Sequence, residues 1–176
     1  MYREAISLAC RFRQREVLPA QAKTRLKGEI KEMRELTEQC ISDLLRMAEE
    51  MLKYSYSPYT MFRVGAALLA ANGEVYTGCN IENAALAGGS CAERTALCRA
   101  VSEGVRSFEA IAVVGGNDGV LSGICAPCGV CRQVLREFCD PETFRVILGE
   151  GNGLYQVVLL KDLLPMSFGP EHLRIE

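Results

Sequence analysis

Apolar residues recur at helical spacing over the first third of the chain. The pattern covers residues 2 to 17, where Pro19 follows as a stop, and then about 29 to 53, which predicts one long helix or two in succession. Pro58 disfavours helix at the residue before it, so the second helix must end by the stretch 55 to 59. The chain therefore is predicted to begin with helices and to enter a loop near residue 55.

Short β-rich runs follow, interleaved with further helical segments. Runs at 64 to 71 and 74 to 78 flank Asn72-Gly73, which predicts a hairpin of two antiparallel strands. The later predicted elements are a helix from 91 to about 102, a strand from 110 to 114 that ends at Gly115, a helix from Pro127 in its first turn to about 138, strands at 144–148 and 155–159, and a helical turn at 161–164. Five strands interleaved with helices predict an α/β fold with one mixed sheet covered by helices.

Composition and charge narrow the class of protein. The 176 residues carry a net charge of −2, with an excess of positive charge in residues 1 to 40 and of negative charge in residues 41 to 176. An acidic main domain argues against a polynucleotide substrate. No apolar run is long enough to cross a bilayer and no secretion signal opens the chain, so we expect a cytoplasmic protein.

The nine cysteines suggest metal binding, because their number is odd and no export signal accompanies them. Cys91, Cys128 and Cys131 can supply three thiolates to a zinc ion and leave its fourth position open, which is typical of a catalytic site. Cys128 and Cys131 are three residues apart at a helix start, so their sulfurs share one face. Cys91 and Glu93 can share a site only across the N-terminal end of a helix, where the dipole also favours a thiolate.

Each of these signals has an alternative interpretation. The stretch from Ser90 to Glu93 also has the form of a capping box, in which Ser90 caps the helix. A single Cys-x-x-Cys is compatible with thiol redox chemistry, a structural metal or simple burial. Cys125 extends that motif like an iron–sulfur run, but Leu135 stands where the run needs its fourth cysteine. The combination of Cys-Ala-Glu with Pro-Cys-x-x-Cys matches a zinc deaminase signature.

The remaining thiols and the single histidine are expected to lie outside the chemistry. We interpret five cysteines as small buried apolar residues: Cys10, Cys40, Cys79, Cys98 and Cys139. His172 is expected to be exposed and not to bind zinc. With a single histidine, a Ser-His or Cys-His hydrolase is poorly supported.

Taken together, the motifs resemble the cytidine deaminases of the small, homotetrameric, free-nucleoside type, from about residue 43 to 172. The motifs that carry the resemblance are Ser57-Pro58-Tyr59, Phe62, Val64-Gly65-Ala66-Ala67, Asn80-Ile81-Glu82-Asn83-Ala84, Cys91-Ala92-Glu93-Arg94-Thr95-Ala96, Pro127-Cys128-Gly129-Val130-Cys131-Arg132-Gln133 and Leu164-Pro165-Met166-Ser167-Phe168-Gly169-Pro170. The resemblance implies a three-layer fold and zinc-dependent hydrolysis of cytidine and deoxycytidine to uridine, deoxyuridine and ammonia. It also implies one zinc per subunit and active sites shared between subunits.

The resemblance also implies a role for each candidate residue. Its implications are zinc binding by Cys91, Cys128 and Cys131, proton transfer by Glu93, contact with the ribose 3′-hydroxyl by Asn80 and Glu82, packing near the base by Phe62, recognition of the cytosine edge by the backbone at Cys91 and Ala92, closure of a neighbouring subunit's site by Phe168, and support of the ligands by Arg94 and Gln133. Asn80 and Glu82 are two apart in an extended segment and so point the same way, although such a pair is usually only a solvated turn.

Three positions depart from the family pattern: Met61, Arg63 and Leu86. They put in doubt the pocket wall and the preference among cytidine, deoxycytidine and modified nucleosides. We expect residues 1–40 to be an added helical segment and residues 41–176 to be the catalytic domain. The alternatives are a deaminase of another aminopyrimidine nucleoside such as a nucleoside antibiotic, a polynucleotide-editing deaminase, and a non-catalytic zinc-bound scaffold.

Overall fold

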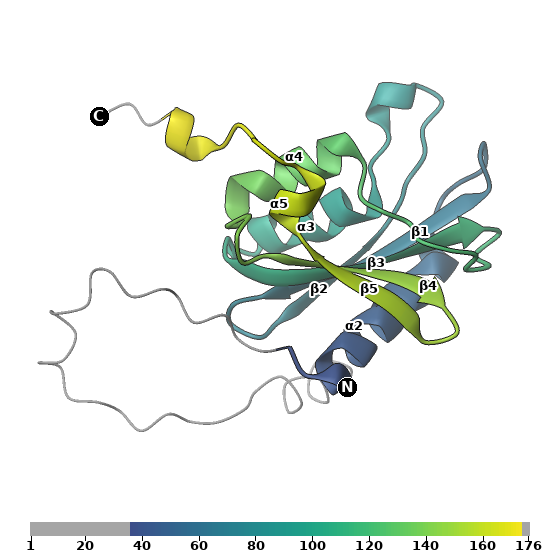
Figure 1. The fold of residues 1–176 in the computed structure, drawn as a ribbon. Coiled ribbons are helices and arrows are strands. Elements are labelled where there is room, and N and C mark those ends of the chain that lie inside the picture. The colour runs from purple at the N-terminus through teal and green to yellow at the C-terminus, as the bar shows by residue number, and fades with distance from the viewer. Residues whose placement is uncertain (1–35, 174–176) are drawn as a thin grey trace, which may run out of the picture.

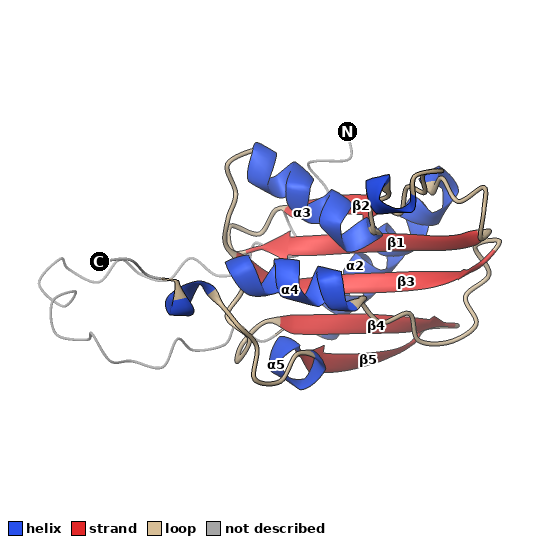
Figure 2. Ribbon diagram, turned by 90° about the horizontal axis from the view of Figure 1, so that it is seen from above, coloured by secondary structure: helices blue, strands red, loops and turns tan. Residues whose placement is uncertain are grey.

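The sheet is built on two long apolar strands, β1 (Phe62–Ala70) and β3 (Phe108–Asn117). In the computed structural model, which describes residues 36–173, they are joined by β2 (Val75–Cys79), β4 (Arg145–Gly151) and β5 (Leu154–Leu159) in the order β2-β1-β3-β4-β5 (Figure 2). β1 pairs antiparallel with β2 and β3, β3 pairs parallel with β4, and β4 pairs antiparallel with β5. The predicted five-stranded mixed sheet is confirmed.

Helices cover both faces of this sheet and make a three-layer domain (Figure 1). One face packs on α2 (Glu38–Met51), and the other carries α3 (Ala92–Ser102), α4 (Gly129–Phe138) and the short α5 (Leu160–Leu163). Three 3₁₀ turns complete the described structure: Leu52–Tyr54, Leu86–Gly88 and Pro170–His172. No helix in the described range is long and apolar enough to cross a membrane.

Alternation along the central strands divides the core into two clusters. Leu68 and Ile111 belong to the cluster beneath α3 and α4, while Leu69 and Ala112 belong to the cluster on the α2 side. All four are at most 1 % exposed. Because successive strand residues point to opposite faces, a strand covered on both sides must be apolar throughout, as the run in β1 is.

The hairpin between β1 and β2 is confirmed, with Gly73 at φ +88° in its turn and Leu69 opposite Val75. The predicted end of β3 at Gly115 is wrong, because the strand continues to Asn117. A Cβ on Gly115 would lie 2.8 Å from Sγ of Cys125, so this glycine lets the following loop lie against a strand that continues.

The helical boundaries differ in two places from the sequence-based expectation. α4 begins at Gly129 with Cys128 as its N-cap, so Pro127 precedes the first turn instead of lying in it. α2 begins at Glu38, where the side chain of Thr37 accepts a hydrogen bond from the backbone N–H of Cys40 at 3.2 Å. The expected helix at 2–17, and the part of the second helix before residue 36, lie outside the described residues. The division at residue 40 stays a prediction.

Gly78 on β2 allows α3 to approach the sheet closely. A Cβ there would lie 2.5 Å from the carbonyl oxygen of Ala92 and 2.5 Å from the backbone nitrogen of Ala96. Both atoms are backbone of the first turns of α3 and cannot rotate away. The absence of a side chain at this position therefore fixes the N-terminal end of α3 against the sheet.

We expect Gly78→Ala to lower the free energy of unfolding by about 2 kcal/mol, since overpacking against backbone forces a shift of α3. Gly129→Ala is the matched control, because a Cβ there meets no atom within 4 Å. Urea unfolding in the presence of a chelator measures both variants without a contribution from metal binding. Equal stabilities would contradict the close approach of α3.

Candidate active site

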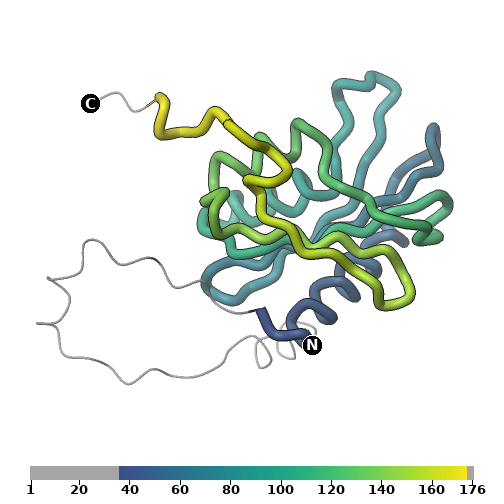
Figure 3. The backbone as a smooth tube through the Cα atoms, viewed as in Figure 1, coloured from purple at the N-terminus to yellow at the C-terminus, as the bar shows by residue number. Residues whose placement is uncertain are grey.

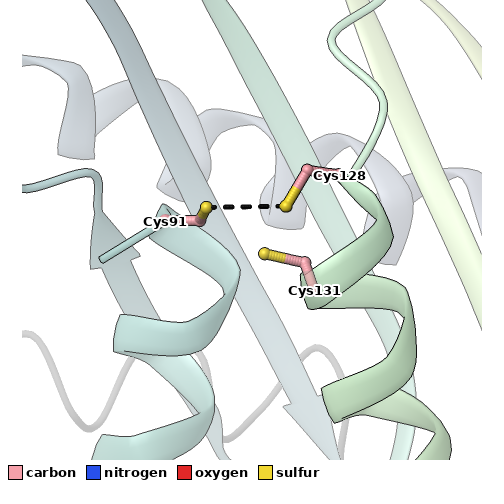
Figure 4. A group of neighbouring side chains, drawn as sticks. All are labelled: Cys91, Cys128 and Cys131. Carbon is pink, nitrogen blue, oxygen red and sulfur yellow. Dashed lines mark hydrogen bonds between the residues drawn. The ribbon is translucent and has the colours of Figure 1, made fainter. Parts of the chain in front are cut away.

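Three cysteine thiols converge where the N-terminal ends of α3 and α4 meet (Figure 4). Cys91 is the N-cap residue of α3, Cys128 is the N-cap of α4, and Cys131 lies in the first turn of α4. Their sulfur atoms all lie within 4.8 Å of one another. The residues predicted to bind metal are thus brought together from two helices separated by β3.

The geometry of these thiols fits a zinc ion. Two thiolates bound to zinc at about 2.3 Å with tetrahedral angles lie about 3.8 Å apart, and Sγ of Cys91 lies 3.7 Å from Sγ of Cys128. Within the described part of the chain, the group of candidate ligands comprises these three cysteines. Cys131 is fully buried whereas Cys128 is exposed, so the group opens towards the surface. A fourth coordination position is left for water or substrate.

The surroundings of the group favour a thiolate at Cys91. A hydrogen bond from the Cys131 thiol, with smaller contributions from Cys128 and the charge of Arg94, lowers the pKa of Cys91 to about 6. The same hydrogen bond raises the pKa of Cys131, whose thiol is the donor, and burial raises it further. The helix N-termini add positive potential from their unpaired N–H groups.

Glu93 lies in the first turn of α3, where the residue is only 4 % exposed. Burial raises the pKa of Glu93, and the neighbouring Cys91 thiolate raises it further. The capping-box interpretation is wrong: Cys91 and not Ser90 is the N-cap, and no side chain caps this helix. A buried carboxyl beside three thiols has the environment of a proton-transfer group.

Arg94 and Cys125 lie next to this centre. Nη2 of Arg94 donates a hydrogen bond to the carbonyl oxygen of Gly89 at 2.8 Å, while its charge lowers the pKa of Cys91. Its support of the zinc ligands stays a prediction. Burial, and then the charges of Glu93 and Cys91, raise the pKa of Cys125 to about 11, so this cysteine is a neutral thiol beside the site.

Asn80 and Glu82 lie in an extended segment that is hydrogen-bonded to the residue preceding Cys91. Ile81 and Ser90 exchange backbone hydrogen bonds of 2.8 and 2.9 Å between them. The side-chain Nδ2 of Asn80 donates to the carbonyl oxygen of Phe62 at 2.8 Å, which brings the predicted base-packing residue into the same region. The segment with the sugar-binding candidates is therefore hydrogen-bonded directly to the segment that leads into the first metal-binding cysteine.

The C-terminal segment that carries Phe168 is held by α4 and leaves the body of the domain (Figure 3). Nε2 of Gln133 donates to the carbonyl oxygen of Phe168 at 2.9 Å. Arg136 donates to Oγ of Ser167 at 2.9 Å and pairs with Glu171. Phe168 stacks on His172, with ring centroids 4.8 Å apart, and remains 54 % exposed. About half of Phe168 is therefore left exposed by the contacts within this chain.

Several residues were placed incorrectly or missed from the sequence. Cys98 is exposed, so its assignment to the core is wrong, whereas Cys40, Cys79 and Cys139 are buried as predicted and Cys10 lies outside the described residues. His172 is exposed, as expected. Arg132 was assigned no role, although it donates to the carbonyl oxygens of Pro127 and Leu163, each at 2.7 Å. It ties the loop that carries Cys128 to the end of α5, and its position directly after Cys131 was the available signal.

The fold and the site together define a zinc-dependent deaminase class. Its features are a three-thiol metal site at two helix N-termini, a buried glutamate beside it and a sheet of order β2-β1-β3-β4-β5. The family model of the cytidine and deoxycytidylate deaminase zinc-binding region matches residues 38–147. The chain belongs to this family.

Individual relatives agree with this assignment. The cytidine deaminase of Sporosarcina psychrophila is 45 % identical over 133 residues, which are 76 % of this chain and 94 % of that protein. The cytidine deaminase of Halalkalibacterium halodurans is 44 % identical over 128 residues, 73 % and 93 % of the two chains. The crystal structure of cytidine deaminase from Burkholderia pseudomallei superposes with a TM-score of 0.66 at 44 % identity, covering 72 % of this chain and 98 % of that one.

Replacing Cys131 by Ser should weaken zinc binding by more than about 100-fold. Losing a residue that only hydrogen-bonds to a metal ligand costs about 10- to 100-fold in affinity, and losing the ligand itself should cost more. Competition with a chromophoric chelator measures the affinity. The control is Cys98→Ser, which removes an exposed thiol in the second half of α3 and should bind zinc like the wild type. Undiminished affinity of the Cys131 variant would exclude the three-thiol site.

Proposed function

We propose that this protein hydrolyses cytidine and deoxycytidine to uridine and deoxyuridine with release of ammonia. The observation that carries the proposal is the buried carboxyl of Glu93 directly beside a three-thiol group with an open fourth position. The relatives from Sporosarcina psychrophila and Halalkalibacterium halodurans, both cytidine deaminases, support the choice of substrate.

The side chains at the junction of α3 and α4 divide the chemistry between them. Cys91, Cys128 and Cys131 would hold zinc, which when bound lowers the pKa of water towards about 7 and so supplies a nucleophile for C4 of the cytosine ring. Glu93 takes the proton released from water and delivers it to N3 of the ring. Glu93 then takes the proton of the hydroxyl that is now on C4 and delivers it to the amino group, so that the C4–N bond breaks, ammonia leaves and C4 becomes a carbonyl carbon. The raised pKa of Glu93 suits a group that both accepts and donates a proton.

The nucleoside half of the site consists of backbone and side-chain polar groups around β1. Ala92 opens α3, where the first N–H groups of a helix are unpaired and can donate to the cytosine edge. Phe62 packs near the base from the start of β1. Asn80 and Glu82 bind the 3′-hydroxyl of the sugar. A free nucleoside therefore fits the site, and the acidic main domain argues against a nucleic acid substrate.

We further propose that the protein is a homotetramer in which Phe168 closes the site of a neighbouring subunit. Large apolar side chains are exposed on the segments next to the site, among them Tyr59, Leu86 and Phe168. Leu86 is 89 % exposed at the tip of the loop between Glu82 and Ser90. A monomer would leave these side chains in water, whereas packing between subunits would bury them.

The proposed catalytic domain is residues 41–176, and residues 1–40 are an added segment. The proposed location of the protein is the cytoplasm. In support, 133 residues of this chain suffice to match 94 % of the Sporosarcina psychrophila relative. The candidate catalytic and binding residues, from Phe62 to Phe168, also all lie within residues 41–176.

The purified protein should convert cytidine and deoxycytidine, measured as loss of aminopyrimidine absorbance, and should leave a cytosine-containing oligonucleotide unchanged. Glu93→Gln should retain zinc and lose about 10²- to 10⁴-fold in kcat, since it cannot transfer protons. Glu103→Gln, at the other end of α3, is the matched control and should retain wild-type activity. A chain beginning at Leu36, which preserves the cap at Thr37, should be as active per zinc as the full chain.

Failure to convert either free nucleoside would overturn the proposed activity. An active Glu93→Gln variant would instead overturn only the role of Glu93, and an inactive chain beginning at Leu36 would overturn the domain division.

Sharing of the active site can be tested by mixing two defective subunits. Glu93→Gln and Phe168→Ala should each be strongly impaired as homomers. Refolded together in equal amounts, they should recover up to about one quarter of wild-type activity, because some sites then combine an intact Glu93 with a neighbour's intact Phe168. No recovery in mixed oligomers would contradict a site completed by Phe168 from a second subunit.

A further inference from the structure

The carboxylate of Glu82 is held by the segment that precedes β1. Oε2 of Glu82 accepts hydrogen bonds from the backbone N–H groups of Tyr59 at 2.9 Å and Thr60 at 3.3 Å. Oε1 of Glu82 accepts one from the hydroxyl of Thr60 at 2.5 Å. Both carboxylate oxygens are therefore oriented by two consecutive residues of one loop.

These contacts leave a defined hydrogen-bonding capacity. A carboxylate oxygen has about two acceptor positions, so Oε2 of Glu82 is filled and Oε1 keeps one. Asn80 is similarly occupied: its Oδ1 accepts from Val64 N–H and the Ser55 hydroxyl, and its Nδ2 donates to Phe62. One N–H of Asn80 and one acceptor position of Glu82 remain. A hydroxyl group, which accepts one hydrogen bond and donates another, has the donor and acceptor that these two groups lack.

The direction of the Thr60 hydroxyl is fixed by its second hydrogen bond. Its Oγ1 accepts the backbone N–H of Phe62 at 3.0 Å, so its single proton is directed to Glu82. Met61, between Thr60 and Phe62, has φ +59°. This left-handed conformation turns the chain so that the N–H of Phe62 reaches the hydroxyl of Thr60. Thr60 thus connects the base-packing residue to the sugar-binding carboxylate.

We propose that Thr60 is a positioning residue that orients Glu82 to bind the 3′-hydroxyl of the nucleoside sugar. The inference rests on the proposed function, because it concerns the same site and the same substrate. Thr60 acts through Glu82 and need not touch the substrate. Removing its hydroxyl frees Oε1 of Glu82 to rotate and lets water compete for the acceptor position.

The kinetic consequence is a loss of binding that is equal in the ground state and the transition state, because the sugar does not react. Thr60→Val should lower kcat/KM for cytidine about fivefold, within the range for one lost hydrogen bond, through a higher KM with nearly unchanged kcat. Thr60→Ser keeps the donor and should restore the wild-type KM. Thr143→Val, in the turn after α4 and at the opposite end of that helix from Cys128, is the control for a general effect of replacing Thr by Val.

Comparison with 3′-deoxycytidine separates the effect through Glu82 from an effect through Phe62. If Thr60 acts through Glu82, Thr60→Val and the wild type should have the same kcat/KM for this analogue, within about twofold. An equal loss with both nucleosides would mean that Thr60 acts through Phe62 or the fold, and would overturn the proposal. A wild-type KM for cytidine in Thr60→Val would overturn it as well.

A second measurement does not depend on turnover. The Thr60 hydroxyl, followed by the backbone N–H groups, holds the pKa of Glu82 below its usual value. NMR titration of the Glu82 carboxyl should give a higher pKa in Thr60→Val and an unchanged one in Thr60→Ser. An unchanged pKa of Glu82 in Thr60→Val overturns the role of Thr60, even if no nucleoside is converted. A raised pKa of Glu82 in the variant together with an inactive wild type would overturn only the proposed activity. If Thr60→Val fails to fold, Thr60→Ala serves in both measurements.

Discussion

The meeting of two helix N-termini on one side of the sheet is the constraint on which the site depends. Cys91 and Cys128 are both N-cap residues, so their thiols lie where unpaired N–H groups favour negative charge. Three thiolates in one place would repel one another without that field and without a cation. The sheet supplies the geometry, because α3 leads into β3 and α4 leads out of it towards the parallel strand β4. Gly78 and Arg132 then fix the position of each helix start.

The metal-binding cysteines and the proposed nucleoside-binding residues are connected through a short backbone link. Ile81 lies between the two sugar-binding candidates and exchanges hydrogen bonds with Ser90, the residue before Cys91. A displacement of the 80–82 segment would therefore move the start of α3 as well. The buried Glu93 and the hydrogen-bonded carboxylate of Glu82 also argue against a non-catalytic scaffold, since holding zinc alone would require neither of them.

The sequence was sufficient for the elements whose signals are local. Asn72-Gly73 specified a hairpin, and the Cys-x-x-Cys spacing placed two sulfurs on one face of α4. Local signals failed where distant backbone is involved. β3 passes Gly115 because the strand stays paired with β1 as far as Asn117, and Ser90 pairs with Ile81 while Cys91 is the N-cap. Thr60 and Arg136 could not be found from spacing, since each contacts a residue far away in the chain.

X-ray absorption at the zinc K edge of the purified protein tests the central claim most directly, because it reports the ligands of the bound metal without reference to activity. The structure predicts three sulfur ligands at about 2.3 Å and one oxygen or nitrogen ligand at about 2.0 Å. Four sulfur ligands would mean that a fourth thiol closes the site, and two or fewer would mean that Cys91, Cys128 and Cys131 do not bind together. Either result would contradict a catalytic zinc centre at the junction of α3 and α4.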